Sequence, residues 1–136
     1  MKRNKYEKLR NIFREYRLLK KELECRTEYI ADFKKILIQP LPIAEEALHK
    51  IYGSIVKDME QKAAKAQKKL RLIEDVIDRL DGTERNVMYF RYIEGIEWIA
   101  MPEYMMYEQR TCQLFETKAL DKIIKMNIDW SNENVK

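Results

Sequence analysis

The chain has 136 residues, of which 37% are charged and only three each are Gly and Pro, and its formal net charge is +4. This composition predicts an all-α protein with short connections, and no run approaches the ~18 apolar residues that a membrane span requires. The N-terminus lacks a signal-peptide pattern, and Cys25, Cys112 and the single His49 lie too far apart for a zinc-binding spacing. We therefore expect a soluble, cytoplasmic protein without metal or cofactor.

The positive charge is concentrated in the N-terminal segment. Residues 1–38 contain 12 Lys or Arg against 6 Asp or Glu, whereas residues 83–136 contain 7 against 9. A basic balance favours a polyanionic partner, because neutralisation of phosphates supplies most non-specific affinity for DNA. The C-terminal segment, however, has no such excess, and this asymmetry counts against a simple DNA-binding function.

One long helix is predicted from Met1 to about Ile38, a stretch without Gly or Pro. Apolar residues recur in it at the three-and-four spacing of a single helical stripe: Leu9, Ile12, Tyr16, Leu19, Leu23, Ile30, Phe33 and Leu37. Such a stripe is typical of a coiled-coil strand or of a helix that packs on a partner helix. Its basic residues form either a solvated face over this seam or an arm that follows DNA phosphates.

The segment Gln39-Pro40-Leu41-Pro42 is predicted to end the first helix, because proline cannot donate a backbone hydrogen bond. A short helical piece, Ile43–Tyr52, then leads to Gly53, and Ser54 is expected to cap a second long helix that ends at Leu80. Its inner stripe is predicted to be Ile55, Met59, Ala63, Ala66, Leu70, Ile73, Ile77 and Leu80. Residues 1–80 are thus expected to form an antiparallel helical hairpin.

Residues 81–126 have the order of elements of a helix-turn-helix module. Asp81-Gly-Thr-Glu84 has the spacing of a capping box, and the helix that it begins is expected to end at Gly95. That helix carries apolar residues toward a core: Val87, Met88, Phe90 and Ile93. A short helix, a tight connection and a longer helix follow, and in the tail, residues 127–136, Trp130 is expected to fold back as an apolar cap.

A family resemblance, without gaps, lies between Leu80 and Leu120. It is carried by Glu84-Arg85, Arg91-Tyr92-Ile93-Glu94-Gly95, Trp98, Met105, Tyr107, Arg110-Thr111 and Lys118-Ala119-Leu120. This stretch resembles the C-terminal module of phage transcription regulators of the RinA and ArpU type, which is similar to region 4 of sigma factors. The resemblance implies a phage or prophage regulator of transcription that binds double-stranded DNA in the cytoplasm of a bacterial host.

The resemblance also implies which residues would contact DNA. The last helix, from Tyr107 to about Met126, would lie in the major groove, with Cys112, Phe115, Ala119 and Ile123 facing inward. The candidate DNA-contacting residues are Gln109, Arg110, Gln113, Thr117 and Lys118. Arg110 is the candidate for bidentate contact to guanine, and Gln109 and Gln113 for contact to adenine or phosphate. The alternative for each is an ordinary solvated surface residue.

Several residues depart from the family pattern. Pro102 replaces a small Ala and costs about 3 kcal/mol inside a helix, so the short helix is expected to be kinked or to end early. Met106 occupies a turn position where a positive φ is expected, and Glu108 occupies the N-cap of the last helix. Leu114 and Glu116 stand where basic residues or His are common. These changes predict a DNA face that is weakened or redirected.

Two functions follow. The first is a DNA-binding transcription regulator, and the alternative is a degenerate helix-turn-helix protein that binds and modulates a protein partner, either RNA polymerase or another host protein. That partner would meet an exposed surface formed by Tyr104, Met105, Met106, Tyr107 and Leu114, unless Met105 and Tyr107 belong to the core. An enzyme is not expected, because no glycine-rich phosphate loop or nucleophile flanked by acids occurs. Whether the chain forms a homodimer is left open.

Overall fold

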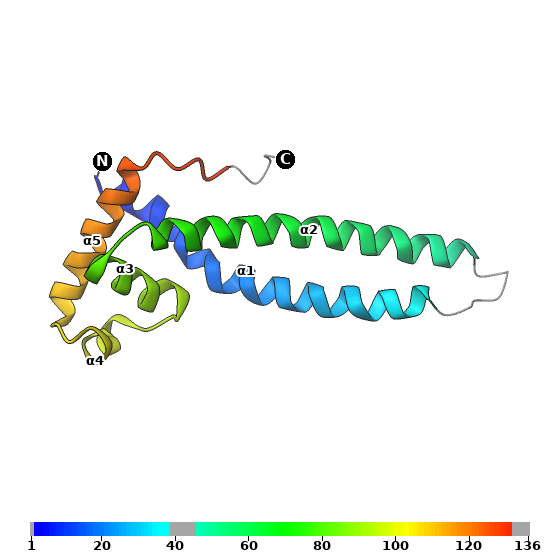
Figure 1. Cartoon of the computed structure of the whole chain (residues 1–136), viewed down its shortest axis with the longest axis horizontal. Coiled ribbons are helices and arrows are strands. Elements are labelled where there is room, and N and C mark those ends of the chain that lie inside the picture. The colour runs from blue at the N-terminus through cyan, green and yellow to red at the C-terminus, as the bar shows by residue number, and fades with distance from the viewer. Residues whose placement is uncertain (1, 39–45, 132–136) are drawn as a thin grey trace.

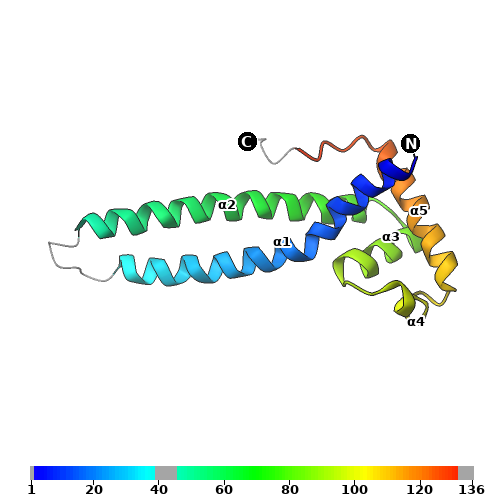
Figure 2. The same ribbon diagram turned by 180° about the vertical axis from the view of Figure 1, so that it is seen from behind.

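The computed structural model describes residues 2–38 and 46–131, and every regular element among them is a helix. Two long helices, α1 (Lys2–Leu37) and α2 (Glu46–Asp78), pack antiparallel, and the remaining elements gather at one end of this pair (Figures 1 and 2). The fold is therefore all-α, a long antiparallel hairpin followed by a C-terminal helical bundle, as the sequence predicts. No helix of the described ranges is long and apolar enough to cross a membrane.

Helix α2 corrects two predictions. It continues through Gly53, so the predicted break there and the predicted cap at Ser54 are wrong. A glycine inside a helix costs only about 1 kcal/mol relative to alanine, and packing against α1 outweighs this. Val56 is buried and Ile55 is exposed, which moves the inner stripe by one residue at this end. The predicted turn at Pro40 and the start of the piece that follows lie outside the described residues.

The two halves of the hairpin differ in burial. We call residues 5–19 and 67–80 the proximal half and residues 20–38 and 46–66 the distal half. A single core joins the proximal half to the C-terminal elements, and Phe13, Ile73 and Val76 are fully buried in it. Phe13 lies off the predicted stripe of α1, but it is buried because the C-terminal elements pack on a second side of that helix. Of the described distal residues, only Val56 and Ala66 are buried.

The C-terminal module, residues 81–126, begins with α3 (Gly82–Met88), which continues as a π-helical turn, Tyr89–Ile93. Asp81 occupies the predicted N-cap, but its side chain makes no capping hydrogen bond, and Glu84 pairs instead with Lys122 at 2.5 Å. The helix therefore begins at the predicted N-cap, but the side-chain hydrogen bond of the predicted capping box is not formed. Gly95 has φ 76° and reverses the chain after the turn, as predicted.

The turn between the last two helices agrees with most local expectations. A 3₁₀ turn, Trp98–Ala100, precedes α4 (Met101–Met105), and α5 (Gln109–Lys125) follows. Pro102 lies in the first turn of α4, where its missing N–H has no intrahelical partner to lose, so the predicted kink or early end is wrong. Met106 has φ 65°, so of the two possibilities, a different turn or a strained residue in the left-handed conformation, the second holds. Glu108 occupies the N-cap of α5.

The segment after α5 returns to the core. The Trp130 ring stands edge-on to the Phe13 ring, with centroids 5.7 Å apart, and its side chain is half-buried against the core cluster. This confirms Trp130 as an apolar cap. The rest of the predicted tail, from residue 132, lies outside the described residues.

Candidate nucleic-acid interface

Helix α5 turns one side into the module and the other outward. Cys112, Ala119 and Ile123 are buried as predicted, and Phe115 is half-buried with its ring edge-on to Tyr107, the centroids 4.9 Å apart. The inward stripe of the predicted recognition helix is therefore confirmed. It fixes which side chains of α5 lie on the opposite, outward side.

Four of the five candidate DNA-contacting side chains are exposed: Gln109, Arg110, Gln113 and Lys118. Thr117 is half-buried, and its hydroxyl donates a hydrogen bond of 3.2 Å to the carbonyl of Gln113 one turn earlier. Within the described part of the chain, Arg110 and Lys118 form no ion pair, so their charges are available to a ligand.

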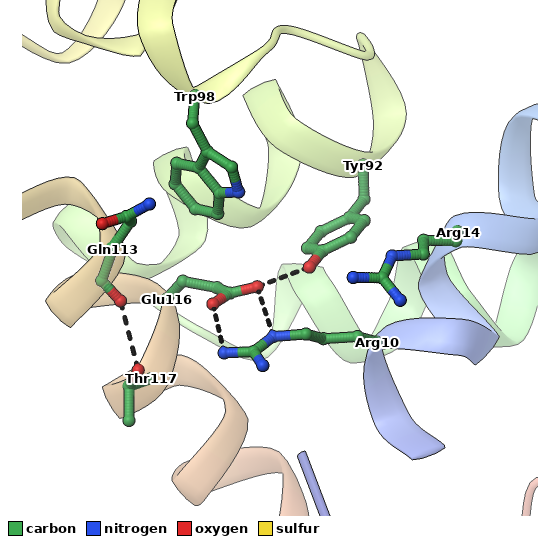
Figure 3. Close-up of a pocket in the computed structure, with 7 residues that line it drawn as sticks. All are labelled: Arg10, Arg14, Tyr92, Trp98, Gln113, Glu116 and Thr117. Carbon is green, nitrogen blue, oxygen red and sulfur yellow. Dashed lines mark hydrogen bonds and ion pairs between the residues drawn. The ribbon is translucent and has the colours of Figure 1, made fainter. Parts of the chain in front are cut away.

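Glu116 does not belong to this outward surface, although the sequence suggests that it does. Its side chain is 3% exposed and accepts two hydrogen bonds from Arg10, Nη2 to Oε1 at 2.9 Å and Nε to Oε2 at 3.1 Å. The hydroxyl of Tyr92 donates to the same carboxylate (Figure 3). We call these three residues the Glu116 cluster. A fork of this kind matches the planar guanidinium to the carboxylate and is among the stronger charged contacts.

The cluster removes a negative charge from the outward side of α5. The hydrogen bonds to Glu116 raise the pKa of Arg10, and burial together with the neighbouring carboxylate raises the pKa of Tyr92. Both groups therefore stay protonated at neutral pH, and the charge of Arg10 balances that of Glu116. Glu116, which stands where the family pattern has basic residues or His, is therefore a buried internal residue of the module.

A depression of about 370 Å³ opens above this cluster, beside α5. Its lining comes from α1, the π-helical turn, the 3₁₀ turn and α5: Arg10, Arg14, Tyr92, Trp98, Gln113, Glu116 and Thr117. In Figure 3, Arg14 and Gln113 lie at opposite ends of it. Arg14 is about half exposed and contacts Glu7 at 3.2 Å and Asn11 at 2.9 Å, all on α1. A weak surface pair of this kind exchanges readily with another anion.

A row of basic residues on α1 continues from this depression. Arg10, Arg14, Arg17 and Lys21 follow one another at spacings of four, three and four, so they share one side of the helix. Arg17 lies over Gly95, and both Arg17 and Lys21 line a second depression beside Tyr89. We call Arg14, Arg17 and Lys21 the basic row. The spacing of these basic residues can be read from the sequence, but the sequence does not show that they lie beside the C-terminal module.

Arg91, one of the residues that carry the family resemblance, has an internal role. Its guanidinium lies 5.2 Å from the centroid of the Trp98 ring and donates to the carbonyl of Ile96 at 3.0 Å. These contacts hold the chain between the π-helical turn and the 3₁₀ turn, and so they position Trp98 at the rim of the depression.

The proposed protein-binding surface is only partly exposed. Met105 is buried, which confirms the alternative that it belongs to the core, whereas Tyr104, Met106, Tyr107 and Leu114 are exposed. Met106 is 84% exposed at the turn between α4 and α5. Apolar side chains therefore surround the N-terminal end of α5, next to its polar side.

Comparison with models of known families, with curated proteins and with solved structures finds no match to this chain. Among the described residues, no three His, Cys, Asp or Glu side chains gather as a metal ion would require. The chemistry that the module offers is thus that of a surface: amides and unpaired cations on α5, arginines on α1, and apolar side chains at the turn.

Proposed function

We propose that the chain is a DNA-binding transcription regulator of a phage or prophage, with α5 as its recognition helix. The observation that carries the proposal is the outward side of α5, where Arg110 and Lys118 are exposed without an ion pair among the described residues. Gln109 and Gln113 are exposed beside them. Amide and guanidinium groups on one side of a helix are the groups that read base edges in the major groove.

The basic row on α1 supports the same proposal. In the sequence, the basic segment is far from the proposed recognition helix. In the structure, α1 packs against α5 through the ion pair Arg10–Glu116 and through a 2.6 Å hydrogen bond from the Tyr6 hydroxyl to Asp121. Arg14 of this row therefore lines the same depression as Gln113 and Thr117 of α5. In the proposed complex Arg110, Gln109 and Gln113 contact bases, while Lys118 and Arg14 contact phosphates and set the position of α5.

Titration with DNA from the region upstream of the protein's own coding sequence, at salt concentrations from 50 to 200 mM, tests this function. We expect a specific complex whose affinity falls steeply with salt, because phosphate contacts release counterions. Arg110→Ala should weaken specific binding about tenfold or more and relax the preference at one base pair, whereas Arg14→Ala should weaken all sequences alike and lower the salt slope by about 1.

The matched control is Lys57→Ala, which removes one exposed charge from the distal half of the hairpin, away from the module. It should leave DNA binding almost unchanged. If the protein binds no DNA at the lowest salt concentration, α5 is not a recognition helix. The same conclusion follows if Lys57→Ala and Arg110→Ala weaken DNA binding equally.

The alternative, a protein that binds RNA polymerase or another host protein, rests on the exposed apolar side chains around the turn. Met106 is 84% and Leu114 is 57% exposed. Leu114→Glu should then abolish binding to purified bacterial RNA polymerase, while Arg110→Ala should not. If instead the wild type binds no polymerase and Arg110→Ala abolishes DNA binding, polymerase is excluded as the partner.

A further inference from the structure

The hairpin has two unlike faces, one on each side of the seam between α1 and α2. Lys34 on α1 pairs with Glu60 on α2 at 2.8 Å in the distal half and marks one face, and Glu15 pairs with Lys69 at 3.7 Å in the proximal half and marks the other. Residues seven apart return to the same side of a helix in a coiled-coil pair, so these two ion pairs identify the face to which other residues belong. We call them the Lys34 face and the Glu15 face.

The Glu15 face is apolar toward the tip of the hairpin. Steps of seven from Glu15 along α1 reach Glu22, Tyr29 and Ile36, and steps of seven back from Lys69 along α2 reach Lys62, Ile55 and Leu48. Ile51 lies between the last two at helical spacing. Within the distal half, the same steps on the Lys34 face reach Thr27, Lys20, Gly53 and Glu46, none of which is a large apolar residue.

These apolar side chains are open to solvent. Tyr29 is 58% exposed, Ile51 52%, Leu48 44% and Ile55 36%. Figures 1 and 2 show the distal half extending away from the module, and none of the described elements beyond α1 and α2 packs beside it. Several exposed apolar side chains on one face of an otherwise charged arm are characteristic of an interaction site.

We propose that this face binds the Glu15 face of a second copy of the chain, so that two hairpins form a four-helix bundle. The charges select the arrangement. On this face α1 carries Glu15 and Glu22, while α2 carries Lys62 and Lys69. Within one chain Lys62 forms an exposed pair with Asp58 at 3.2 Å, and such a pair exchanges readily with another carboxylate. If α1 lies over α2 of the second copy, opposite charges meet, whereas α1 over α1 sets carboxylates against carboxylates. The first arrangement has a two-fold axis parallel to the helices.

The same arrangement brings the apolar residues together. Glu15 on α1 lies opposite Lys69 on α2. Because the two helices are antiparallel, seven residues forward on α1 match seven residues back on α2. Glu22 is therefore level with Lys62, and Tyr29 is level with Ile55. In the two-fold dimer Glu22 therefore faces the partner's Lys62, and Tyr29 faces the partner's Ile55. Both modules then lie at the same end of the bundle. The inference rests on the hairpin alone and does not depend on DNA binding.

Sedimentation equilibrium on the full chain tests the association. The wild type should sediment as a dimer at micromolar concentrations, and Ile51→Glu/Ile55→Glu should sediment as a monomer with unchanged helical circular dichroism, because both side chains are exposed in the single chain. Ile99→Glu is the matched control, since Ile99 is 81% exposed in the module. A monomeric wild type, or a dimer that survives the double substitution, overturns the proposal.

A charge exchange identifies the contact between copies. Glu22→Lys and Lys62→Glu should each weaken the dimer about tenfold, because each homodimer then opposes like charges twice. An equimolar mixture should recover the wild-type dimer, because the mixed pair restores both attractions between chains while each single chain keeps its altered charges. Failure of the mixture to associate more tightly than either variant alone overturns this contact.

The relative direction of the two hairpins is measured with spin labels. In a Cys25→Ser background, a label on Asn86→Cys reports the separation of the modules, since Cys112 is buried and Asn86 is exposed. The proposed dimer requires a label-to-label distance shorter than the length of α1, whose 36 residues span about 54 Å. A longer distance indicates hairpins that point in opposite directions and overturns the two-fold arrangement.

Discussion

The proximal and distal halves of the hairpin consist of the same two helices, yet they are stabilised differently. In the proximal half α1 is enclosed on two sides, and Phe13 and Tyr16 are almost fully buried. In the distal half α1 meets only α2, and most seam residues remain half-exposed. A helix pair alone buries too little apolar surface to be rigidly packed, so the C-terminal module stabilises the half that it covers. The distal half retains apolar surface that a partner can bury.

The largest expected difference between the halves concerns truncation of a seam isoleucine. Ile73→Ala should destabilise the protein by about 4 kcal/mol, because Ile73 is fully buried and its removal leaves a cavity. Ile30→Ala, at a half-buried seam position of the distal half, should cost only about 1 kcal/mol. Urea unfolding followed by circular dichroism measures both. Similar losses would mean that the distal seam is packed as tightly as the proximal core.

The Glu116 cluster offers a second contrast, between two arginines of one helix. Arg10→Ala should destabilise the protein by about 3 kcal/mol, because it leaves the carboxylate of Glu116 buried without its cation. Arg14→Ala removes an exposed pair with Glu7 and should change the stability by less than about 0.5 kcal/mol. An equal effect of the two substitutions, in the same unfolding assay, would contradict the internal role of Arg10.

Alkaline pH should weaken the proximal half specifically. Burial raises the pKa of both Tyr16 and Tyr92 above the ordinary value of 10.0, and the carboxylates of Glu74 and Glu116 raise them further. Below pH 10 both tyrosines are neutral in the folded and the unfolded chain, so their contribution is complete. Above pH 10 these two tyrosines ionise readily only in the unfolded chain. The free energy of unfolding should therefore fall by about 1.4 kcal/mol per pH unit for each tyrosine.

Substitution of Tyr92 by phenylalanine checks the origin of this loss. Tyr92→Phe should lower the stability at pH 7, where the hydrogen bond to Glu116 is lost, but it should flatten the slope between pH 10 and 11. Tyr104→Phe, at an exposed position of α4 outside the proposed dimer contact, is the control for the loss of one hydroxyl group. An unchanged slope for Tyr92→Phe would assign the alkaline loss to other groups.

Two glycines give the smallest effects, with opposite signs. Gly95 has φ 76°, and a Cβ there would lie 2.3 Å from Nη1 of Arg17, so Gly95→Ala should destabilise the protein by about 1 kcal/mol. Gly53 lies inside α2 with no atom within 4 Å of an added Cβ, so Gly53→Ala should stabilise it by about 0.5–1 kcal/mol. Thermal unfolding resolves both, and a stabilising Gly95→Ala would contradict the turn geometry described above.

Local features of this fold were predictable from the sequence. The two long helices, the antiparallel hairpin and the inward side of α5 follow from apolar periodicity, which depends only on residues three and four apart. The left-handed conformation at Gly95 follows from a glycine at a helix end, whereas that at Met106 was suggested only by the family resemblance. The predicted break at Gly53 was wrong because a local preference of about 1 kcal/mol yields to packing along a whole helix.

The sequence alone determined which residues lie on α5, including the exposed Arg110 and Gln113, and it located the excess positive charge in α1. Only the tertiary structure decided which of those residues share a surface. Glu116 points inward because Arg10, 106 positions earlier, docks against it, and the same docking places Arg14 at the depression that Gln113 also lines. Helical periodicity defines a face of each helix, but the angle at which two distant helices cross depends on side-chain packing between them, which no local pattern contains.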